Sequence, residues 1–337
     1  YKDNRSEAYK QELANVMYSY LTIVNDPYSK DWQDMEPWIR FANSLKLRMA
    51  IHMSGIEPQT AKEWAEEAVR DGVTDTPENE IAVYPSMAGV DHPLVQITDW
   101  HDIAIGASFM NLLQNLDHPY MKYLFEKNSV GLAKSPQAVE GSSCPATTPI
   151  NSVYVGMRNG VAPGEGQAAA NNPYAGYSML NKTYLAQAMP PLYFMKCSEV
   201  FFLMAEGALR GWNMNGTPQQ FYEQGIRYAA LEARTTMNNE YNQLVDEYLN
   251  VEAPKGIAYV DPQGLTPDMP SVTKIGVKWN EGDSPEVKLE KIITQKYIAS
   301  FPYSYESWVD LRRVGYPKLF PILGVADSDG TIGAGDP

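Results

Sequence analysis

The clearest hydrophobic pattern in the chain runs from Trp38 to Met53. Its apolar residues recur every three or four positions, which places them on one face of an α-helix. Gly55 follows where a helix commonly ends, and Pro58 stands where the next helix can begin. A second helix is therefore predicted over 58–70, closed by Asp71-Gly72, and the two segments together indicate a pair of helices joined by a short turn.

A second pair is predicted between 192 and 233. Residues 192–209 carry a broad apolar stripe that includes Phe194 and Phe201, and Gly211 ends it. The stretch Thr217-Pro218-Gln219-Gln220 then has the form of a capping box with proline at the first helical position. We expect the returning helix to begin there and to continue to about residue 233.

The third pair is predicted near the end of the chain. Its first helix begins at Ser284-Pro285 and bends at Phe301-Pro302. The second runs from about 305 to 314 and presents Trp308 and Leu311. Helix pairs of this kind build tetratricopeptide-like arrays, although the 34-residue consensus is absent. The predicted fold class is therefore all-α, with tetratricopeptide-like helix pairs.

Between these pairs the chain is less regular. One further helix is predicted over 98–116, capped by Thr98 or Asp99. The segments 126–191 and 251–283 lack periodicity and are broken repeatedly by glycine and proline. Long irregular loops inside a compact domain are usually functional or disordered. We predict a single helical domain over 1–337 that carries these two long loops.

Composition narrows the possible partners. The formal net charge is −14 and the sequence pI about 4.8, so nucleic acid and anionic lipid headgroups are repelled. No run approaches the ~20 apolar residues of a membrane span. Cys144 and Cys197 lack the spacing of a zinc site, and they are two unrelated thiols or one optional bridge. The start at Tyr1, within polar sequence, leads us to expect a processed or trimmed N-terminus upstream.

Three segments carry a family resemblance. They read WIRFANSLKLRMA at 38–50, MKCSEVFFLMAEGALRGW at 195–212, and IITQKYIA at 292–299 followed by ESWVDLRRVGYP at 306–317. Each is similar to a motif of the SusD/RagB family of Bacteroidetes outer-membrane lipoproteins, and the motifs occur in the family's order. The chain is therefore identified as a member of that family that lacks the lipobox cysteine, the N-terminal helices and the Arg-rich C-terminal segment.

The resemblance implies a function as well as a fold. A protein of this family is held by a lipid to the outer leaflet of the outer membrane, facing the exterior. It covers a SusC-like TonB-dependent transporter and delivers oligosaccharides to it, or peptides in some members. The resemblance implies no covalent chemistry and no cofactor. The lipid anchor would lie in a part of the protein that this chain does not contain.

We expect the side chains of these motifs to hold the helices together and not to bind a ligand. Charged and amide side chains stand in the middle of helices that otherwise present apolar stripes, and such residues usually pair to fix helix positions. The residues concerned are Asn43, Arg48, Glu199, Glu206, Arg312 and Arg313.

Ligand contacts are expected on loops carried by the rigid helices. Trp100, His101 and Asp102 stand near a predicted helix start, and three tyrosines lie in the first irregular segment. Aromatic rings stack on the apolar face of a sugar, while neighbouring polar groups bind its hydroxyls. Packing remains the alternative, since a lone tryptophan at a helix start is often part of a core. The predicted ligand-binding residues are Trp100, His101, Asp102, Tyr154, Tyr174 and Tyr177.

An enzyme is not predicted. The four histidines show no metal-binding spacing, and the sequence has no G-x-S-x-G, P-loop or G-x-G-x-x-G motif. With 41 acidic residues, some two carboxylates can always be imagined as the acid and base of a glycosidase. Their abundance therefore does not indicate that activity. We therefore predict no catalytic residue, metal ligand or cofactor. The alternatives are a peptide-binding member of the family, a helical-repeat glycoside hydrolase, and a helical adaptor that grips peptides in a groove.

Overall fold

The computed structural model describes residues 35–83, 93–100, 103–128, 153–160, 176–181, 192–229, 240–262, 266–303 and 305–323, without the side chains of residues 99, 100 and 240–242. Helices dominate these residues, which confirms the predicted fold class. The chain clusters into two compact units, the first from Tyr1–His92, Met189–Leu231 and Ala299–Tyr303, the second from Pro93–Ala188, Glu232–Ile298 and Ser304–Pro337. The single domain over 1–337 stays a prediction, and each unit is described by itself.

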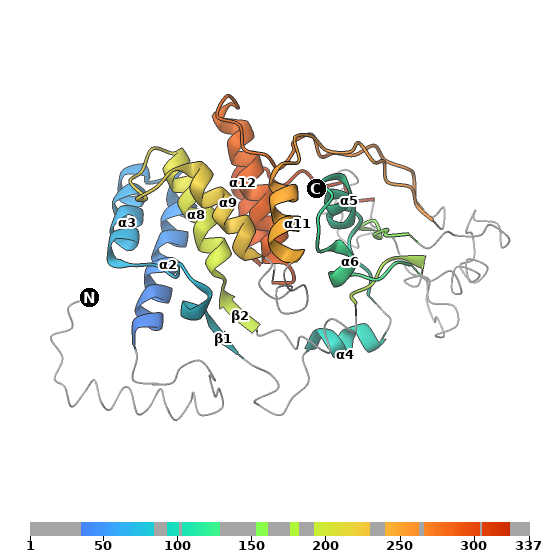
Figure 1. Ribbon diagram of the computed structural model, residues 1–337, viewed down its shortest axis with the longest axis horizontal. Helices are drawn as coiled ribbons and strands as arrows, with labels where there is room; N and C mark the ends of the chain where they lie inside the picture. The colour runs from blue at the N-terminus through green and yellow to red at the C-terminus, as the bar shows by residue number, and fades with distance from the viewer. Residues whose placement is uncertain are drawn as a thin grey trace, which may run out of the picture. The chain divides into compact units, whose positions relative to one another are not determined.

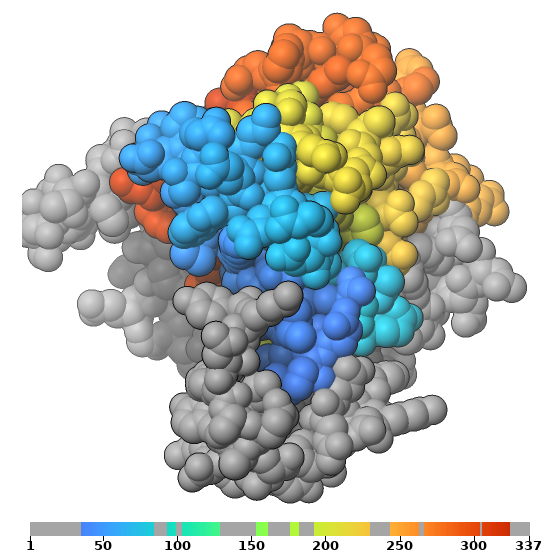
Figure 2. Space-filling view, turned by 90° about the vertical axis from the view of Figure 1, so that its left-hand side faces the viewer, coloured from blue at the N-terminus to red at the C-terminus, as the bar shows by residue number. Residues whose placement is uncertain are grey.

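The first unit contains two helix pairs and a small sheet (Figure 1). Helix α2 (Glu36–Met53) packs on α3 (Pro58–Asp71), and α8 (Cys197–Leu209) packs on α9 (Pro218–Ala229). The 3-10 turn η1 (Pro77–Asn79) leads to β1 (Ile81–Val83), which pairs antiparallel with β2 (Leu192–Met195). In Figure 2 the light-blue surface of the first pair meets the yellow surface of the second. The first two predicted helix pairs are confirmed.

The core of the first unit lies where α8 contacts both α2 and α9. On α2, Leu47, Ala50 and Ile51 are fully buried, whereas Met49, which the apolar spacing from Trp38 to Met53 placed on the buried face, is 55% exposed. Almost every residue of α8 is buried, since helices cover it on more than one side. A Cβ at Gly225 would lie 2.8 Å from the ring of Phe202, so this glycine allows α9 to approach α8 closely.

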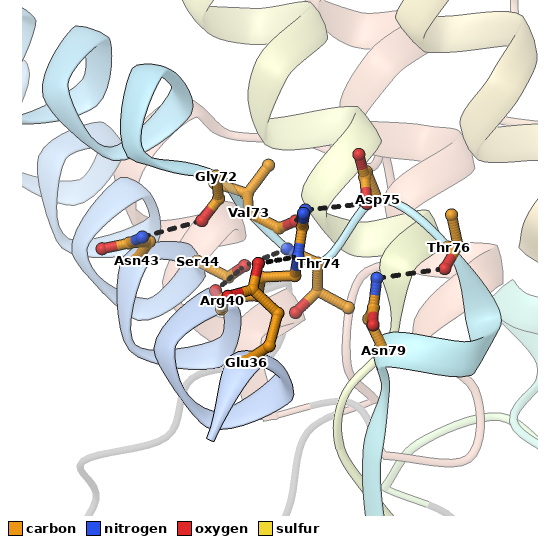
Figure 3. Close-up of polar contacts among 10 residues, drawn as sticks. All are labelled: Glu36, Arg40, Asn43, Ser44, Gly72, Val73, Thr74, Asp75, Thr76 and Asn79. Carbon is orange, nitrogen blue, oxygen red and sulfur yellow. Dashed lines mark hydrogen bonds and ion pairs between the residues drawn. The ribbon is translucent and has the colours of Figure 1, made fainter. Parts of the chain in front are cut away.

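The polar face of α2 fixes the chain that leaves α3 (Figure 3). Arg40 Nη1 donates to the carbonyl of Val73 at 3.0 Å, and Asn43 Nδ2 donates to the carbonyl of Gly72 at 2.7 Å. The hydroxyl of Ser44 accepts from the backbone N–H of Thr74 at 2.9 Å. These bonds satisfy backbone groups that no helix or sheet uses, and they direct the chain toward η1 and β1.

An ion pair joins the first two sequence motifs. Arg48 donates from Nε and Nη2 to the two carboxylate oxygens of Glu199, each at 2.8 Å. Both side chains are only 15% exposed, so this two-pronged contact is largely shielded from water. On the same helix, Glu206 accepts from Arg210 Nη2 at 2.7 Å and is itself buried. The packing role predicted for Arg48, Glu199 and Glu206 is confirmed.

Residues 192–195 correct one prediction. They form strand β2 instead of the first turn of a helix, and Phe194 is 57% exposed instead of facing the core. Helix α8 begins at Cys197, whose backbone N–H donates to Glu80 Oε1 at 2.7 Å. The helical pattern failed here because β1, more than a hundred residues earlier in the chain, supplies the backbone partners for this short segment.

The described helices of the second unit are α4 (Pro93–Trp100), α5 (Ala107–Asn115), α6 (Met121–Leu124), α11 (Glu240–Leu249), α12 (Pro285–Ser300) and α13 (Tyr305–Val314). The last two residues of α12 belong to the first unit. One continuous helix over 98–116 is wrong, because residues 103–106 break it. Ile105 and Gly106 pair instead with Ser178 and Met157, and Thr98 donates its hydroxyl to the carbonyl of Leu94 inside α4.

Helices α12 and α13 are linked by buried charge. Asp310 is 1% exposed; it forms an ion pair with Lys296 Nζ at 2.9 Å and accepts a hydrogen bond from Arg313 Nη2 at 2.8 Å. The packing role predicted for Arg313 is thus confirmed. The expectation for its neighbour is wrong, since Arg312 is exposed and lies 5.5 Å from the ring centroid of Trp308. Trp308 is itself 58% exposed, because Asp310 and Ser307 occupy the buried face of α13.

The described part of the irregular segment 251–283 contains no helix or strand beyond one bridge between Tyr259 and Met269. Asn115, which is fully buried, holds it to α5: its Oδ1 accepts from Ile257 N at 2.8 Å and its Nδ2 donates to Ile257 O at 3.0 Å. The prediction of an irregular segment is confirmed there. Most of 126–191 lies outside the described residues.

His118 is expected to make the protein less stable in acid. Its imidazole is buried against the edges of Tyr120 and Tyr248, with ring centroids 5.0 Å away in each case. Burial lowers the pKa of His118 to about 3, against about 6.5 in an unfolded chain. Because the folded state favours the neutral ring, its contribution is complete above pH 6.5 and is lost as the pH falls toward 3, by up to ~1.4 kcal/mol per pH unit.

Urea unfolding of the wild type and of His118→Gln at several pH values between 7 and 4.5 would measure this effect. The two proteins share their carboxylates, so the difference between their slopes isolates the imidazole. Equal slopes would contradict the expectation.

Candidate functional site

The candidate site is a surface that short irregular segments of the second unit build around Tyr154. Four such segments pair through their backbones. Met157 N donates to Ile105 O and Ala107 N to Met157 O, each at 2.8 Å, and Ser178 N donates to Val155 O at 2.7 Å. Gly156 is needed where two of them meet, since a Cβ there would lie 2.6 Å from Gly106 O. This framework gives the loop segments a fixed conformation without long strands.

The fourth segment, 124–128, joins the framework from α6. Glu126 N donates to Met179 O at 2.9 Å, and Asn128 N donates to Val153 O at 2.9 Å. The buried side chain of Asn128 also accepts from Val153 N at 2.7 Å. The residue after Val153 is Tyr154, which is therefore held beside the end of α6.

Tyr154 is half-buried and has two lysines near it. Its carbonyl accepts from Gln114 Nε2 of α5 at 2.6 Å, which fixes the backbone beneath the ring. Lys127 Nζ lies 5.7 Å from the Tyr154 ring centroid, and Lys122 Nζ lies 4.9 Å from that of the neighbouring Tyr123. Partial burial raises the pKa of Tyr154, and the charge of Lys122 offsets part of the rise. The phenol therefore stays protonated and is able to donate a hydrogen bond at neutral pH.

We call the residues Lys122, Tyr123, Lys127 and Tyr154 the Tyr154 surface. It offers aromatic rings, a phenol donor and ammonium groups, all at least partly accessible to solvent. Rings of this kind stack on apolar faces of a ligand, and the ammonium groups donate to hydroxyl or carboxylate oxygens. Sequence reasoning missed Lys122 and Tyr123 because α6 is a single turn without periodicity, and it missed Lys127 because that residue lies in the irregular segment after α6.

Tyr177 has a different environment from Tyr154. It is 1% exposed, and its Oη donates to Asp261 Oδ1 at 2.9 Å. The other carboxylate oxygen of Asp261 accepts from Thr266 N at 2.8 Å. Burial, followed by the charge of Asp261, raises the pKa of Tyr177 far above its ordinary value. This geometry favours a packing role, and the ligand contact expected of Tyr177 stays a prediction.

The other predicted site residues are less fully described. Trp100 is the last residue of α4, but its side chain lies outside the described residues, as do His101, Asp102 and Tyr174 entirely. The roles of these four residues stay predictions. Within the described residues no group of three or more histidine, cysteine or acidic side chains is placed to hold a metal ion. No described helix is both long and apolar enough to cross a membrane.

The comparisons with known proteins agree on one family. A sequence model described as SusD-like, "Susd and RagB outer membrane lipoprotein", matches residues 8–335. No curated protein matches the chain.

Solved structures match as well. A chitin-binding SusD homolog from Flavobacterium johnsoniae is 29% identical, with a TM-score of 0.70 over 96% of this chain and 64% of the other. A SusD homolog from Bacteroides ovatus is 31% identical, with a TM-score of 0.68 over 97% and 62%. One from Bacteroides vulgatus is 26% identical, with a TM-score of 0.72 over 98% and 64%. The chain thus spans less than two thirds of the length of these relatives.

Proposed function

Since the chain belongs to the SusD-like family of outer membrane lipoproteins, we propose that it is a glycan-binding protein of the cell surface that delivers oligosaccharides to a SusC-like TonB-dependent transporter. A lipid anchor would hold the protein to the outer membrane, facing the exterior. The similarity to a chitin-binding homolog supports a glycan as the ligand.

The Tyr154 surface is the observation that supports binding by this chain itself. A ring whose backbone is fixed from beneath by Gln114 loses little conformational freedom when a sugar stacks on it. Lys122 and Lys127 are exposed, so they are able to reach ligand oxygens without leaving a core. We extend the proposed site toward Trp100, His101, Asp102 and Tyr174, where the sequence predicts further contacts.

The same surface suits binding without turnover. Rings and ammonium groups hold a ligand, whereas cleavage of a glycosidic bond needs two carboxyl groups about 5 to 10 Å apart on either side of it. We propose no catalytic residue and no cofactor.

An array of glycans and peptides, followed by titration calorimetry, tests the proposed function. We expect binding to an oligosaccharide and no release of reducing ends from it by repurified protein. Binding to peptides alone would favour the peptide-binding alternative. Hydrolysis that persists through repurification would favour a glycoside hydrolase and overturn the proposal.

Truncating Tyr154 should weaken the binding of that oligosaccharide. A stacking ring is commonly a binding hot spot, so we expect Tyr154→Ala to cost about 2 kcal/mol, or roughly thirtyfold in Kd. Trp100→Ala, measured in parallel by calorimetry, tests the extension of the site.

The matched control is Tyr305→Ala, which removes an 85% exposed tyrosine from α13 of the same unit. It should bind like the wild type. If the control loses affinity and Tyr154→Ala does not, the ligand binds near α13 instead.

A further inference from the structure

Arg158 is a buried cation whose hydrogen bonds are incomplete. It follows Met157 of the framework and is 4% exposed. Its Nη2 donates to the carbonyl of Pro321 at 2.6 Å, and its guanidinium carbon lies 5.3 Å from the ring centroid of Phe320. Nε and Nη1 are also buried, and neither has a hydrogen-bond partner among the protein atoms. The N–H groups on Nε and Nη1 are therefore not accepted by any protein atom.

The charge of Arg158 is not neutralised by a carboxylate. Among the described residues, Arg158 forms no ion pair, and its polar contact to Pro321 is with a neutral carbonyl. A buried ion without a counter-charge is strongly disfavoured, and each buried donor left unsatisfied adds to the cost. The ring of Phe320 offsets only part of this, because a cation–π contact is weaker than an ion pair in the same surroundings.

Tyr259 also lies beside Phe320, with ring centroids 5.7 Å apart. Its buried hydroxyl group interacts with the buried hydroxyl of Thr266. Burial is the main reason why the pKa of Tyr259 is raised above its ordinary value, so its phenol keeps its proton. The carboxylate of Asp261 already accepts from Tyr177 and Thr266.

We propose that Arg158 is the centre of a buried binding site for one small monovalent anion of the size of chloride. Such an ion would neutralise the guanidinium group and accept from Nε or Nη1. The donor atoms have almost no surface open to solvent, so a compact ion without substituents fits this position better than a glycan does. The site is separate in chemistry from the Tyr154 surface and does not rest on the proposed function.

Thermal unfolding in sodium chloride and in sodium gluconate, compared at equal ionic strength, tests this site. Binding to the folded state should give a saturating rise in Tm of roughly 3 °C with chloride at about a hundred times its Kd. Arg158→Met removes the charge and donors but keeps much of the volume, and it should abolish the rise. Arg70→Met, at a side chain that is 67% exposed in α3, is the control and should keep it. No chloride effect in the wild type, or an unchanged effect in Arg158→Met, would overturn the proposal.

If Arg158→Met does not fold, a second measurement tests the proposed anion site. Crystals of the wild-type protein soaked in sodium bromide should show an anomalous peak within roughly 3.5 Å of Arg158 Nε or Nη1. No peak there would overturn the proposal. A peak without any chloride effect on Tm would mark an adventitious ion only and would also count against it.

Discussion

Replacing Asp310 with alanine is expected to lower the free energy of unfolding by about 3 to 5 kcal/mol. The carboxylate is buried and forms ion pairs with both Lys296 and Arg313, and the side chain of Lys296 is only 4% exposed. Burial alone would raise the pKa of Asp310, but the two cations outweigh it and the pKa lies below its ordinary value. Removing the carboxylate leaves two cations near each other in a region that water scarcely reaches, and urea unfolding would measure the loss.

The control for Asp310→Ala is Glu252→Ala. Glu252 forms an ion pair with Lys278 at 2.6 Å, but its side chain is 75% exposed. An exposed pair gains little because water and salt screen it, so this variant should unfold almost like the wild type. Similar losses in the two variants would show that burial does not set the strength of the Asp310 contacts.

Replacing Phe202 with alanine should cost about as much, roughly 3 to 5 kcal/mol. The side chain is 1% exposed, and Tyr222 meets its ring edge-on with centroids 6.4 Å apart. The cavity left by the ring cannot close easily, because Gly225 already brings the backbone of α9 close to it. Denaturant unfolding would measure the loss, and binding by the remaining folded protein should be nearly unchanged.

Phe194→Ala is the matched control for Phe202→Ala. Phe194 lies in the same unit but is 57% exposed on β2, so its loss should stay within about 1 kcal/mol. A loss at Phe194 as large as at Phe202 would show that cavity formation is not the cause.

The helix pairs could be predicted because their ends carry local signals. Gly55 and Pro58 mark the turn between α2 and α3, and the capping box at Thr217 forms as predicted, with Gln220 N donating to Thr217 Oγ1 at 3.2 Å. Such signals depend on neighbours in the sequence alone. Helix α11 was not predicted, since no glycine or proline precedes Glu240 to mark where a helix begins.

Features that depend on distant residues could not be predicted. Strand β2 exists because β1 pairs with it, and the break before α5 exists because Ile105 and Gly106 pair with later segments. For the same reason, only part of the candidate site could be predicted from the sequence. Tyr154 stands out in the sequence as an aromatic residue in an irregular segment, whereas its closeness to Lys127 depends on the bonds between Asn128 and Val153.

The way the first unit is assembled has a consequence for how the protein is made. Its last stretch, Ala299–Tyr303, comes after most of the second unit in the chain, and Lys196 Nζ donates to Phe301 O at 3.5 Å within the first unit. A ribosome must therefore pass residue 303 before the first unit is complete, although all its other residues have been synthesised by 231. A chain truncated at 231 would lack this stretch, and such late contacts slow folding by requiring the closure of a long loop.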